Sequence, residues 1–231
     1  MSIMKVPAYL NRTNYGPIFI FFFSDSPTET GLNHLIKSNS KAFHYHSDNN
    51  NYDMGIYNIG SGDLDEKTQH STIPVYDFIN NTLILKRRYI DSKFIFLIEN
   101  NNIESIRLLA SLNIFYLLSK NEDVHFIHKA ITNQVNIMSQ NTSPKVIDKI
   151  PNGEINKTLS MREWFVLNSL ARNLSPNAIS KASGISIKTI SAHKVNAMNK
   201  LRLTSPQLLK LLMQLAEVKS ISTIMIKDSP K

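Results

Sequence analysis

The sequence predicts an α/β doubly wound parallel sheet followed by an all-α four-helix domain. Strand-like apolar runs alternate with helical patterns through residues 1–137, as in a parallel sheet with helices on both faces. Four helix starts then follow within residues 158–219. Residues 1–150 hold 14 Lys and Arg against 14 Asp and Glu, and residues 151–231 hold 12 against 4, so the net charge of +8 comes from the C-terminal third. Such a local excess is typical of a module that binds a polyanion.

The N-terminal domain, residues 1–137, is expected to begin with a strand in the aromatic run 17–25, because a continuous apolar run is typical of a strand buried on both faces. The same patterns predict further strands at 41–48, 52–60, 93–100 and 114–120, a polar loop at 61–71, and helices near Leu32 and at 75–89, 103–112 and 123–137. A site in such a fold should lie at the carboxyl ends of the strands.

A linker is expected at residues 138–157, which are polar and interrupted by Pro144, Pro151 and Gly153. After it, four helices are expected at roughly 160–172, 175–182, 186–201 and 205–217. Their predicted N-caps are Ser160 (a capping box with Glu163), Ser175, Ser186 and Ser205. Trp164, the single tryptophan, is expected to pack on the surface of its own domain, and residues 220–231 are expected to form a tail.

The third of these helices carries the candidate site. Only a tight turn containing Gly184 separates it from the second helix, which is the geometry of a helix-turn-helix. One side of the helix is apolar, and the other carries the small residues that could approach base edges, with Asn199 beside them. The predicted base-reading residues are Ser191, Ala192 and Val195, and the predicted phosphate contacts are Lys188, Thr189, Lys194 and Lys200. By itself, this pattern also fits a solvated lysine face on an ordinary helical bundle.

The segment LSMREWFVLNSLARNLSPNAISKASGISIKTISAHKVNAMNKLRL resembles the LuxR-type (LuxR/FixJ) DNA-binding domain along its length, and IKTISAHKVNAMNKL is most similar to the enterobacterial Rcs-type regulators. The resemblance implies a four-helix domain that binds DNA as a dimer, with the final helix contributing to self-association. The leucine stripe of that helix fits this role, and it equally fits completion of the domain core: Leu208, Leu211, Leu212 and Leu215. Asn173 and Arg202 replace glycines that the family usually has, and Ser183 replaces a leucine.

Residues 17–137 resemble a degenerate receiver domain, the domain that often precedes a LuxR-type module. Aligned by its strands, the position of the phosphate-accepting aspartate is Asn58, the acidic pair is reduced to Ser24 and Asp25, and Lys120 occupies the place of the receiver lysine. Because an amide cannot form an acyl phosphate, we expect a domain that acts without aspartyl phosphorylation, in dimerisation or partner docking. Asp25 and Lys120 are expected to pair as a structural remnant.

Other classes of protein find little support in the sequence. The chain lacks cysteine, which excludes disulfides and thiolate zinc sites, and no apolar run is long enough to span a bilayer. We find no secretory signal, no Walker loop, no GxSxG elbow and no HExxH helix, so we expect a cytoplasmic protein that is no enzyme and has no cofactor. His44 and His46 have no identifiable third ligand, so no metal site is expected.

The sequence therefore indicates a bacterial transcription regulator that binds specific double-stranded DNA as a dimer. Genes for surface structures such as fimbriae, capsule and biofilm are its candidate targets, and RNA polymerase is a candidate partner. The alternative is a non-enzymatic co-regulator that forms a heterodimer with another LuxR-type regulator and binds DNA weakly alone. No membrane partner is expected.

Overall fold

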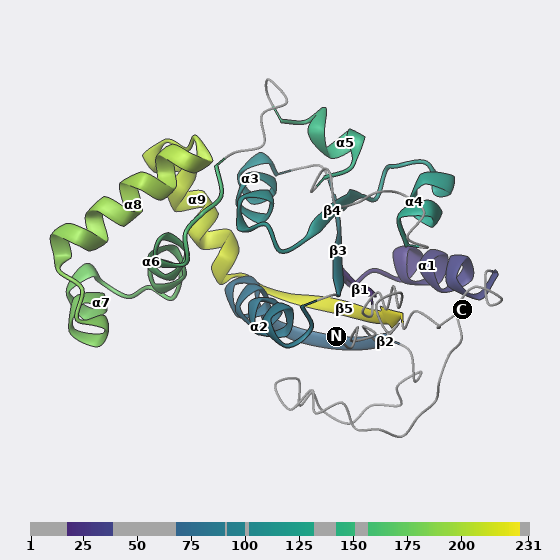
Figure 1. The fold of residues 1–231 in the computed structure, drawn as a ribbon, viewed down its shortest axis with the longest axis horizontal. Coiled ribbons are helices and arrows are strands. Elements are labelled where there is room, and N and C mark those ends of the chain that lie inside the picture. Colours follow the sequence, from purple (N-terminus) through teal and green to yellow (C-terminus); the bar gives the residue numbers. More distant parts are fainter. Residues whose placement is uncertain are drawn as a thin grey trace, which may run out of the picture.

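The computed structural model describes residues 18–38, 68–90, 92–99, 102–131, 142–150 and 157–226. An α/β unit and a four-helix unit lie side by side in it, and the chain passes from the second unit back into the first (Figure 1). The elements are, in chain order, β1 (Ile18–Phe23), α1 (Ser26–Ser38), β2 (Thr68–Pro74), α2 (Val75–Arg88), β3 (Lys93–Ile98), α3 (Ile103–Leu112), β4 (Tyr116–Ser119), α4 (Val124–Ile131), α5 (Pro144–Ile147), α6 (Met161–Ala171), α7 (Pro176–Ser183), α8 (Ile187–Leu201), α9 (Ser205–Ala216) and β5 (Val218–Ile226).

The five strands form one mixed sheet in the order β2-β5-β1-β3-β4. Strands β1, β3 and β4 pair in parallel, as predicted, with Phe19 opposite Phe94 and Phe96 opposite Leu117. Strand β5, which the sequence analysis placed mostly in a tail, pairs antiparallel with both β1 and β2, so the sheet is mixed and not parallel throughout. Strand β5 follows α9 with only Glu217 between them, so the chain returns to the sheet from the four-helix unit.

Helices cover both faces of the sheet, as a doubly wound fold requires. On one face, Phe19, Phe21 and Phe96 pack against α2 and α3, and the rings of Phe21 and Phe78 meet edge to face with centroids 5.3 Å apart. On the other face, alternate residues of the same strands, such as Ile20, pack against α1 and α4. Burial on both faces explains why these strands appear in the sequence as continuous apolar runs.

Two segments between the predicted elements differ from the sequence predictions. The polar segment predicted as a loop at 61–71 contributes its end to β2, whose backbone pairs with β5 in an antiparallel ladder. The predicted linker 138–157 contains α5, because Val146 is fully buried in the core and the backbone N–H of Ser143 donates to the Leu117 carbonyl at 2.8 Å. The predicted strands at 41–48 and 52–60 lie outside the described residues.

The predicted tail 220–231 forms most of β5 as far as Ile226, beyond which the structure describes no residue. Ile221 and Ile224 are both buried, and they face opposite sides of the sheet because side chains alternate along a strand. A nine-residue strand at the end of the chain therefore contributes to both layers of the N-terminal core.

The four-helix unit agrees with the prediction within a residue or two at each end. Ser160 and Glu163 form the capping box, and Ser175 and Ser186 each accept a hydrogen bond at a helix start. The N-cap of α9 is Thr204, one residue before the predicted Ser205, and its backbone N–H donates to Gln207 Oε1 at 2.9 Å.

The two units share one continuous apolar core. Trp164 is buried, and its indole N–H donates to Asn80 Oδ1 on α2 at 3.0 Å, so the prediction that it packs on the surface of its own domain was wrong. Arg107 on α3 donates from Nη1 to the Arg202 carbonyl at 3.1 Å. The leucines Leu208, Leu211 and Leu215 of α9 belong to the same cluster as the residues of α2 and α3. Of the two roles open to this stripe, completion of the core is the one observed. No described helix is long and apolar enough to cross a membrane.

The role of β5 predicts a stability effect that the sequence does not. We expect Ile221→Ala to lower the free energy of unfolding by about 2–5 kcal/mol, because it opens a cavity in the shared core. Val218→Ala on the same strand removes an exposed side chain and is expected to change it by less than about 0.5 kcal/mol. Urea unfolding of both variants tests this, and equal losses would contradict the place of β5 in the core.

Candidate nucleic-acid interface

Helices α7 and α8 are joined by a tight turn whose backbone dictates its residues. Gly184 has a φ of 70°, the left-handed conformation that a residue without a Cβ adopts at no steric cost, and its N–H donates to the Ser180 carbonyl. Two residues on, Ser186 accepts from the backbone N–H of Thr189 at 3.1 Å and begins α8. The two caps fix where one helix stops and the next starts.

Helix α8 divides into a buried side and an exposed side. Ile190, Ala197 and Leu201 are at most 2% exposed, and Ile190 packs with Val166 and Ile179 in the core of the helix-turn-helix. This is the stripe that the sequence predicts as core-facing. Its burial holds the opposite side of the helix toward solvent.

The exposed side carries the predicted base-reading residues. Ser191 and Ala192 are exposed, and Val195 keeps 51% of its surface accessible. Lys188 and Asn199 are exposed on the same stripe. Lys188 lies four positions before Ala192, and Asn199 lies eleven positions after Lys188. Ser191 and Ala192 are the small side chains of this row, and they let the backbone approach a groove closely.

The four predicted phosphate-contacting residues differ in where their side chains point. Lys188 and Lys194 are exposed, and Thr189 is exposed with its hydroxyl 2.8 Å from the Ser186 hydroxyl. Lys200 instead directs its ammonium inward, where Nζ lies 2.7 Å from Glu163 Oε2 and 3.1 Å from the Thr158 carbonyl. The structure thus gives Lys200 a role within the domain that the sequence analysis missed.

The pair of Glu163 and Lys200 ties α6 to α8. Burial raises the pKa of Glu163, but the hydrogen bonds from Lys200 and Ser160 and the Lys200 charge outweigh it and hold the pKa below its ordinary value of 4.5. The carboxylate is therefore charged at neutral pH and serves both the capping box and the ion pair.

The two family glycines that this chain lacks are replaced without loss of the helix ends. Asn173 has a φ of 60° and Arg202 a φ of 52°, so both residues adopt the left-handed conformation themselves. For Arg202 that conformation costs about 1–2 kcal/mol. Its carbonyl accepts the hydrogen bond from Arg107, which helps to fix the last turn of α8 against α3. Ser183 fills its position with a hydrogen bond from its hydroxyl to the Ile179 carbonyl at 2.7 Å.

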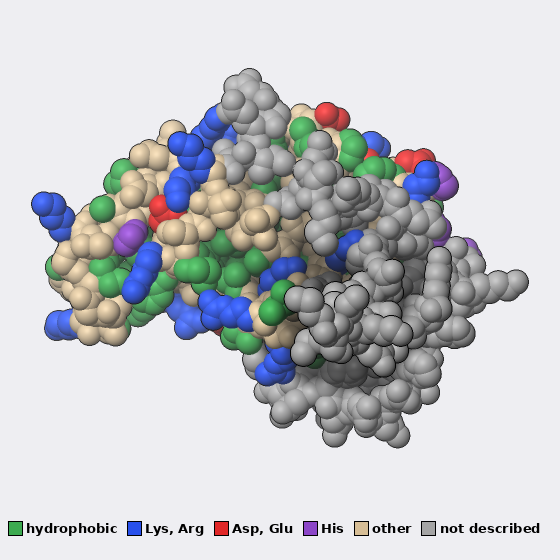
Figure 2. Space-filling view, viewed as in Figure 1, with side chains coloured by type: hydrophobic (Ala, Val, Ile, Leu, Met, Phe, Trp, Pro, Cys, Tyr) green, Lys and Arg blue, Asp and Glu red, His purple; other side chains and the backbone are tan. Residues whose placement is uncertain are grey.

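Positive charge gathers at the end of the molecule formed by α6, α7 and α8. Figure 2 shows Lys and Arg side chains projecting around this end, with few acidic side chains beside them. The exposed lysines on α7 and α8 include Lys181, Lys188 and Lys194. A surface of this kind attracts a polyanion and orients it before close contact.

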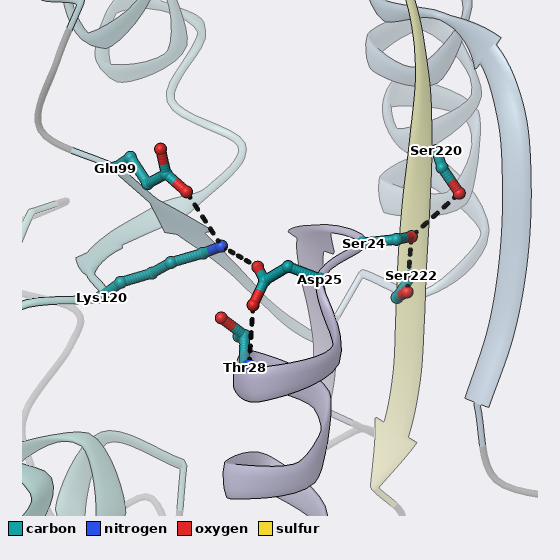
Figure 3. Close-up of polar contacts among 7 residues, drawn as sticks. All are labelled: Ser24, Asp25, Thr28, Glu99, Lys120, Ser220 and Ser222. Atoms are coloured by element: carbon teal, nitrogen blue, oxygen red, sulfur yellow. Dashed lines mark hydrogen bonds and ion pairs between the residues drawn. The ribbon is translucent and has the colours of Figure 1, made fainter.

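Polar side chains meet at the carboxyl ends of β1, β3 and β4 (Figure 3). Lys120 pairs with Asp25, as predicted, and its Nζ also lies 3.5 Å from Glu99 Oε1. Burial raises the pKa of Asp25, but hydrogen bonds from Lys120 and Thr28 and the Lys120 charge outweigh it, so the pKa lies below 3.8. The carboxylate is thus neutralised by a lysine of the chain itself.

Ser24 faces β5 rather than this ion pair. Its hydroxyl lies 2.7 Å from the Ser222 hydroxyl and 3.1 Å from that of Ser220. Asn58, His44 and His46 lie outside the described residues. Within the described ranges, no three His, Cys, Asp or Glu side chains group closely enough to hold a metal ion.

Comparison with known proteins agrees with the four-helix geometry. Residues 157–225 match the family described as bacterial regulatory proteins, luxR family. The chain carries a LuxR-family helix-turn-helix domain at its C-terminus. The match to the LuxR family begins just before α6 and includes all four helices and most of β5.

Among solved structures, the chain is similar to RcsB in a structure of two RcsB dimers bound to two parallel DNAs, with 27% identity over 59% of this chain and 66% of that one, and a TM-score of 0.33. It is also similar to RcsB from Salmonella enterica serovar Typhimurium bound to the promoter P1flhDC in the presence of phosphomimetic BeF3⁻, with 28% identity over 60% and 66% of the two chains and a TM-score of 0.36. The chain thus spans 66% of the length of these RcsB structures. No curated protein sequence matches it significantly.

Sequence reasoning missed the residues that hold the LuxR-type domain against the α/β unit. Asp77 pairs with Arg172 at 2.5 Å, and Glu104 lies 3.3 Å from Lys210. These pairs join positions about a hundred residues apart, so no local pattern reveals them. The one available signal was Glu104 itself, an acidic residue in the first turn of an otherwise apolar helix.

Lys200 gives a prediction that separates folding from DNA contact. We expect Lys200→Ala to lower the free energy of unfolding by about 1.5–3 kcal/mol at neutral pH, because it leaves the buried Glu163 carboxylate without its ammonium partner. Since the pKa of Glu163 is lowered by folding, this difference is full above pH 4.5 and shrinks as the pH falls through the folded pKa. Lys194→Ala, at an exposed site, should leave stability unchanged at every pH; chemical unfolding at several pH values compares the two.

Proposed function

We propose that this protein is a bacterial transcription regulator that binds double-stranded DNA by inserting α8 into the major groove. The observation that carries the proposal is the exposed side of α8, where small residues form a row flanked by lysines while the opposite side is fully buried. In a helix-turn-helix the second helix enters the groove and the first crosses the backbone. The luxR-family match over residues 157–225 supports the same reading.

Within this proposal the residues divide by role. Ser191 and Ala192 allow close approach, and the methyl groups of Ala192 and Val195 suit a thymine methyl. Lys188, Thr189 and Lys194 meet phosphates, which set the position of the protein without reading sequence. Asn199 lies on the same stripe near the end of α8. Lys200 contributes by holding α8 against α6.

The lysines predict a strong dependence of DNA affinity on salt. We expect Lys188→Ala and Lys194→Ala each to weaken binding and to reduce the slope of log affinity against log salt by about 1, because each variant releases one fewer counterion. Lys149→Ala removes an equal charge from the exposed turn after α5, away from the basic end, and should change neither quantity. Fluorescence anisotropy measures both, first with control regions of fimbria, capsule and biofilm genes, the candidate targets. A flat salt response of the unaltered protein would contradict the proposal.

Val195 gives the complementary test of sequence reading. We expect Val195→Ala to leave the salt slope unchanged and to reduce discrimination at one base pair of each half-site by roughly 1–2 kcal/mol, because it removes two methyl groups from an apolar contact. Selection of binding sites from a randomised duplex pool, with the unaltered protein and the variant in parallel, identifies that position. Identical preferences would show that Val195 does not face a base.

We further propose that the protein acts as a dimer and that the α/β unit controls it without aspartyl phosphorylation. Leu209 and Met213 on α9 are 61% and 65% exposed and lie one turn apart. They form an apolar surface beside the leucines of α9 that are buried in the core. In the α/β unit, Lys120 already neutralises Asp25, and the receiver alignment puts an amide at position 58.

Sedimentation, together with a chemical assay for phosphoaspartate, tests both parts of this proposal. The protein is expected to sediment as a dimer to the same extent with and without acetyl phosphate and magnesium, and to form no acid-stable, base-labile phosphate on any aspartate. A monomer that appears also in the presence of DNA would contradict the dimer. A phosphoaspartate, or a dimer that appears only with acetyl phosphate, would contradict phosphorylation independence. Leu209→Lys with Met213→Lys should yield monomer, and Ile84→Lys, at an exposed apolar site of α2, serves as the control.

A further inference from the structure

A cavity of about 290 Å³ lies where the carboxyl ends of β1 and β3 meet α2, α3 and the junction of α9 with β5. Its lining comes from both units, with Phe23 and Phe96 on the strands, Phe78 on α2, and Leu215 from α9. It therefore occupies the edge of the sheet where ligands bind in doubly wound folds. It is separate from the exposed side of α8.

The cavity opens to solvent at a polar mouth and has a mostly apolar inner wall. Ligand pockets begin at about 300 Å³, so the cavity has the size of a small ligand site. Its inner wall is apolar and offers few of the two to four polar partners that an ordered water needs. An apolar ligand therefore interacts more favourably with this wall than water does.

Aromatic rings form the inner wall. The Phe23 and Phe96 rings meet edge to face with centroids 5.4 Å apart, and the Phe78 ring lies 5.4 Å from Phe96. Ile98 and Ile106 complete the wall from β3 and α3. Rings in edge and offset contact accept a further aromatic ring in the same arrangements, so the wall favours a planar aromatic guest.

Charged side chains line the mouth, and acceptors outnumber donors there. Among the described lining residues the lysine is Lys219, whose Nζ lies 2.7 Å from Glu217 Oε2 and 5.9 Å from the centre of the Phe23 ring, so its charge is already paired. Glu99 is 63% exposed and only 3.5 Å from Lys120, whose closer partner is Asp25. The carboxylate of Glu99 is thus the mouth group with most capacity to accept a new donor.

From this arrangement we propose that the cavity binds a small aromatic amine, with its ring against Phe23, Phe78 and Phe96 and its ammonium at the carboxylates of Glu99 and Glu217. The volume fits on the order of a dozen non-hydrogen atoms. Because Leu215 and Glu217 come from the segment that links the LuxR-type domain to β5, the guest would contact both units at once. The site does not depend on DNA binding.

Three naphthalene probes that differ in charge test the proposal: 2-naphthylmethylamine, 2-naphthol and 2-naphthoate. Isothermal titration of the full chain is expected to show saturable one-to-one binding of the amine, in the micromolar to millimolar range typical of so small a ligand. The amine should bind at least about tenfold more tightly than the naphthoate, because the mouth repels a carboxylate. Naphthol should fall between them.

Two pairs of variants place the binding in this cavity. Ser105→Phe puts a ring across the opening and should abolish binding, whereas Ser105→Ala loses the same hydrogen bond to Gln214 and should keep it. Glu99→Gln with Glu217→Gln should remove the preference for the amine, and Asp148→Asn, at the exposed C-cap of α5, should not. Circular dichroism and thermal melts confirm that each variant is folded.

Each outcome of these experiments supports or overturns the proposed amine site. Absence of saturable binding by all three probes overturns the proposal, and so does binding that Ser105→Phe leaves intact. A naphthoate that binds as tightly as the amine overturns the assignment of an amine. Since no step uses DNA, failure here leaves the proposed regulator function standing, and failure of DNA binding leaves the cavity proposal standing.

Discussion

The insertion of β5 between β1 and β2 is the constraint on which the rest of the structure depends. It is the last described strand of the chain, and it completes a sheet whose other strands belong to the N-terminal unit. Because only Glu217 separates α9 from β5, the sheet fixes the position of α9, and α9 in turn fixes the helix-turn-helix. The two units therefore share one apolar core.

This shared core determines which surfaces remain free for partners. Leu208, Leu211 and Leu215 of α9 are buried against α2 and α3, whereas Leu209 and Met213 remain exposed. The buried stripe of α8 faces α6 and α7, which leaves the row of Ser191, Ala192 and Val195 in solvent at the far end of the molecule. The docked arrangement thus keeps the proposed DNA-contacting side accessible.

The α/β unit keeps the framework of a receiver and changes its chemistry. Asp25 and Lys120 still meet at the carboxyl ends of the strands, but they satisfy each other, and Ser24 turns to the hydroxyls of β5. The added strand also brings Glu217 and Lys219 to this edge, beside the aromatic cavity. This edge of the sheet therefore carries an ion pair and an apolar cavity side by side.

By itself the sequence determined the elements whose signals are local. The four C-terminal helices, their caps at Ser160, Ser175 and Ser186, and the buried strands β1 and β3 follow from periodicity, capping and apolar runs, which act within a few residues. The same periodicity put Ser191 and Val195 on the open side of α8. Only the tertiary structure decided that β5 enters the sheet antiparallel, that Trp164 reaches Asn80, and that Lys200 turns inward to Glu163. These are pairings between distant segments, and their free energy comes from burial that no local pattern records.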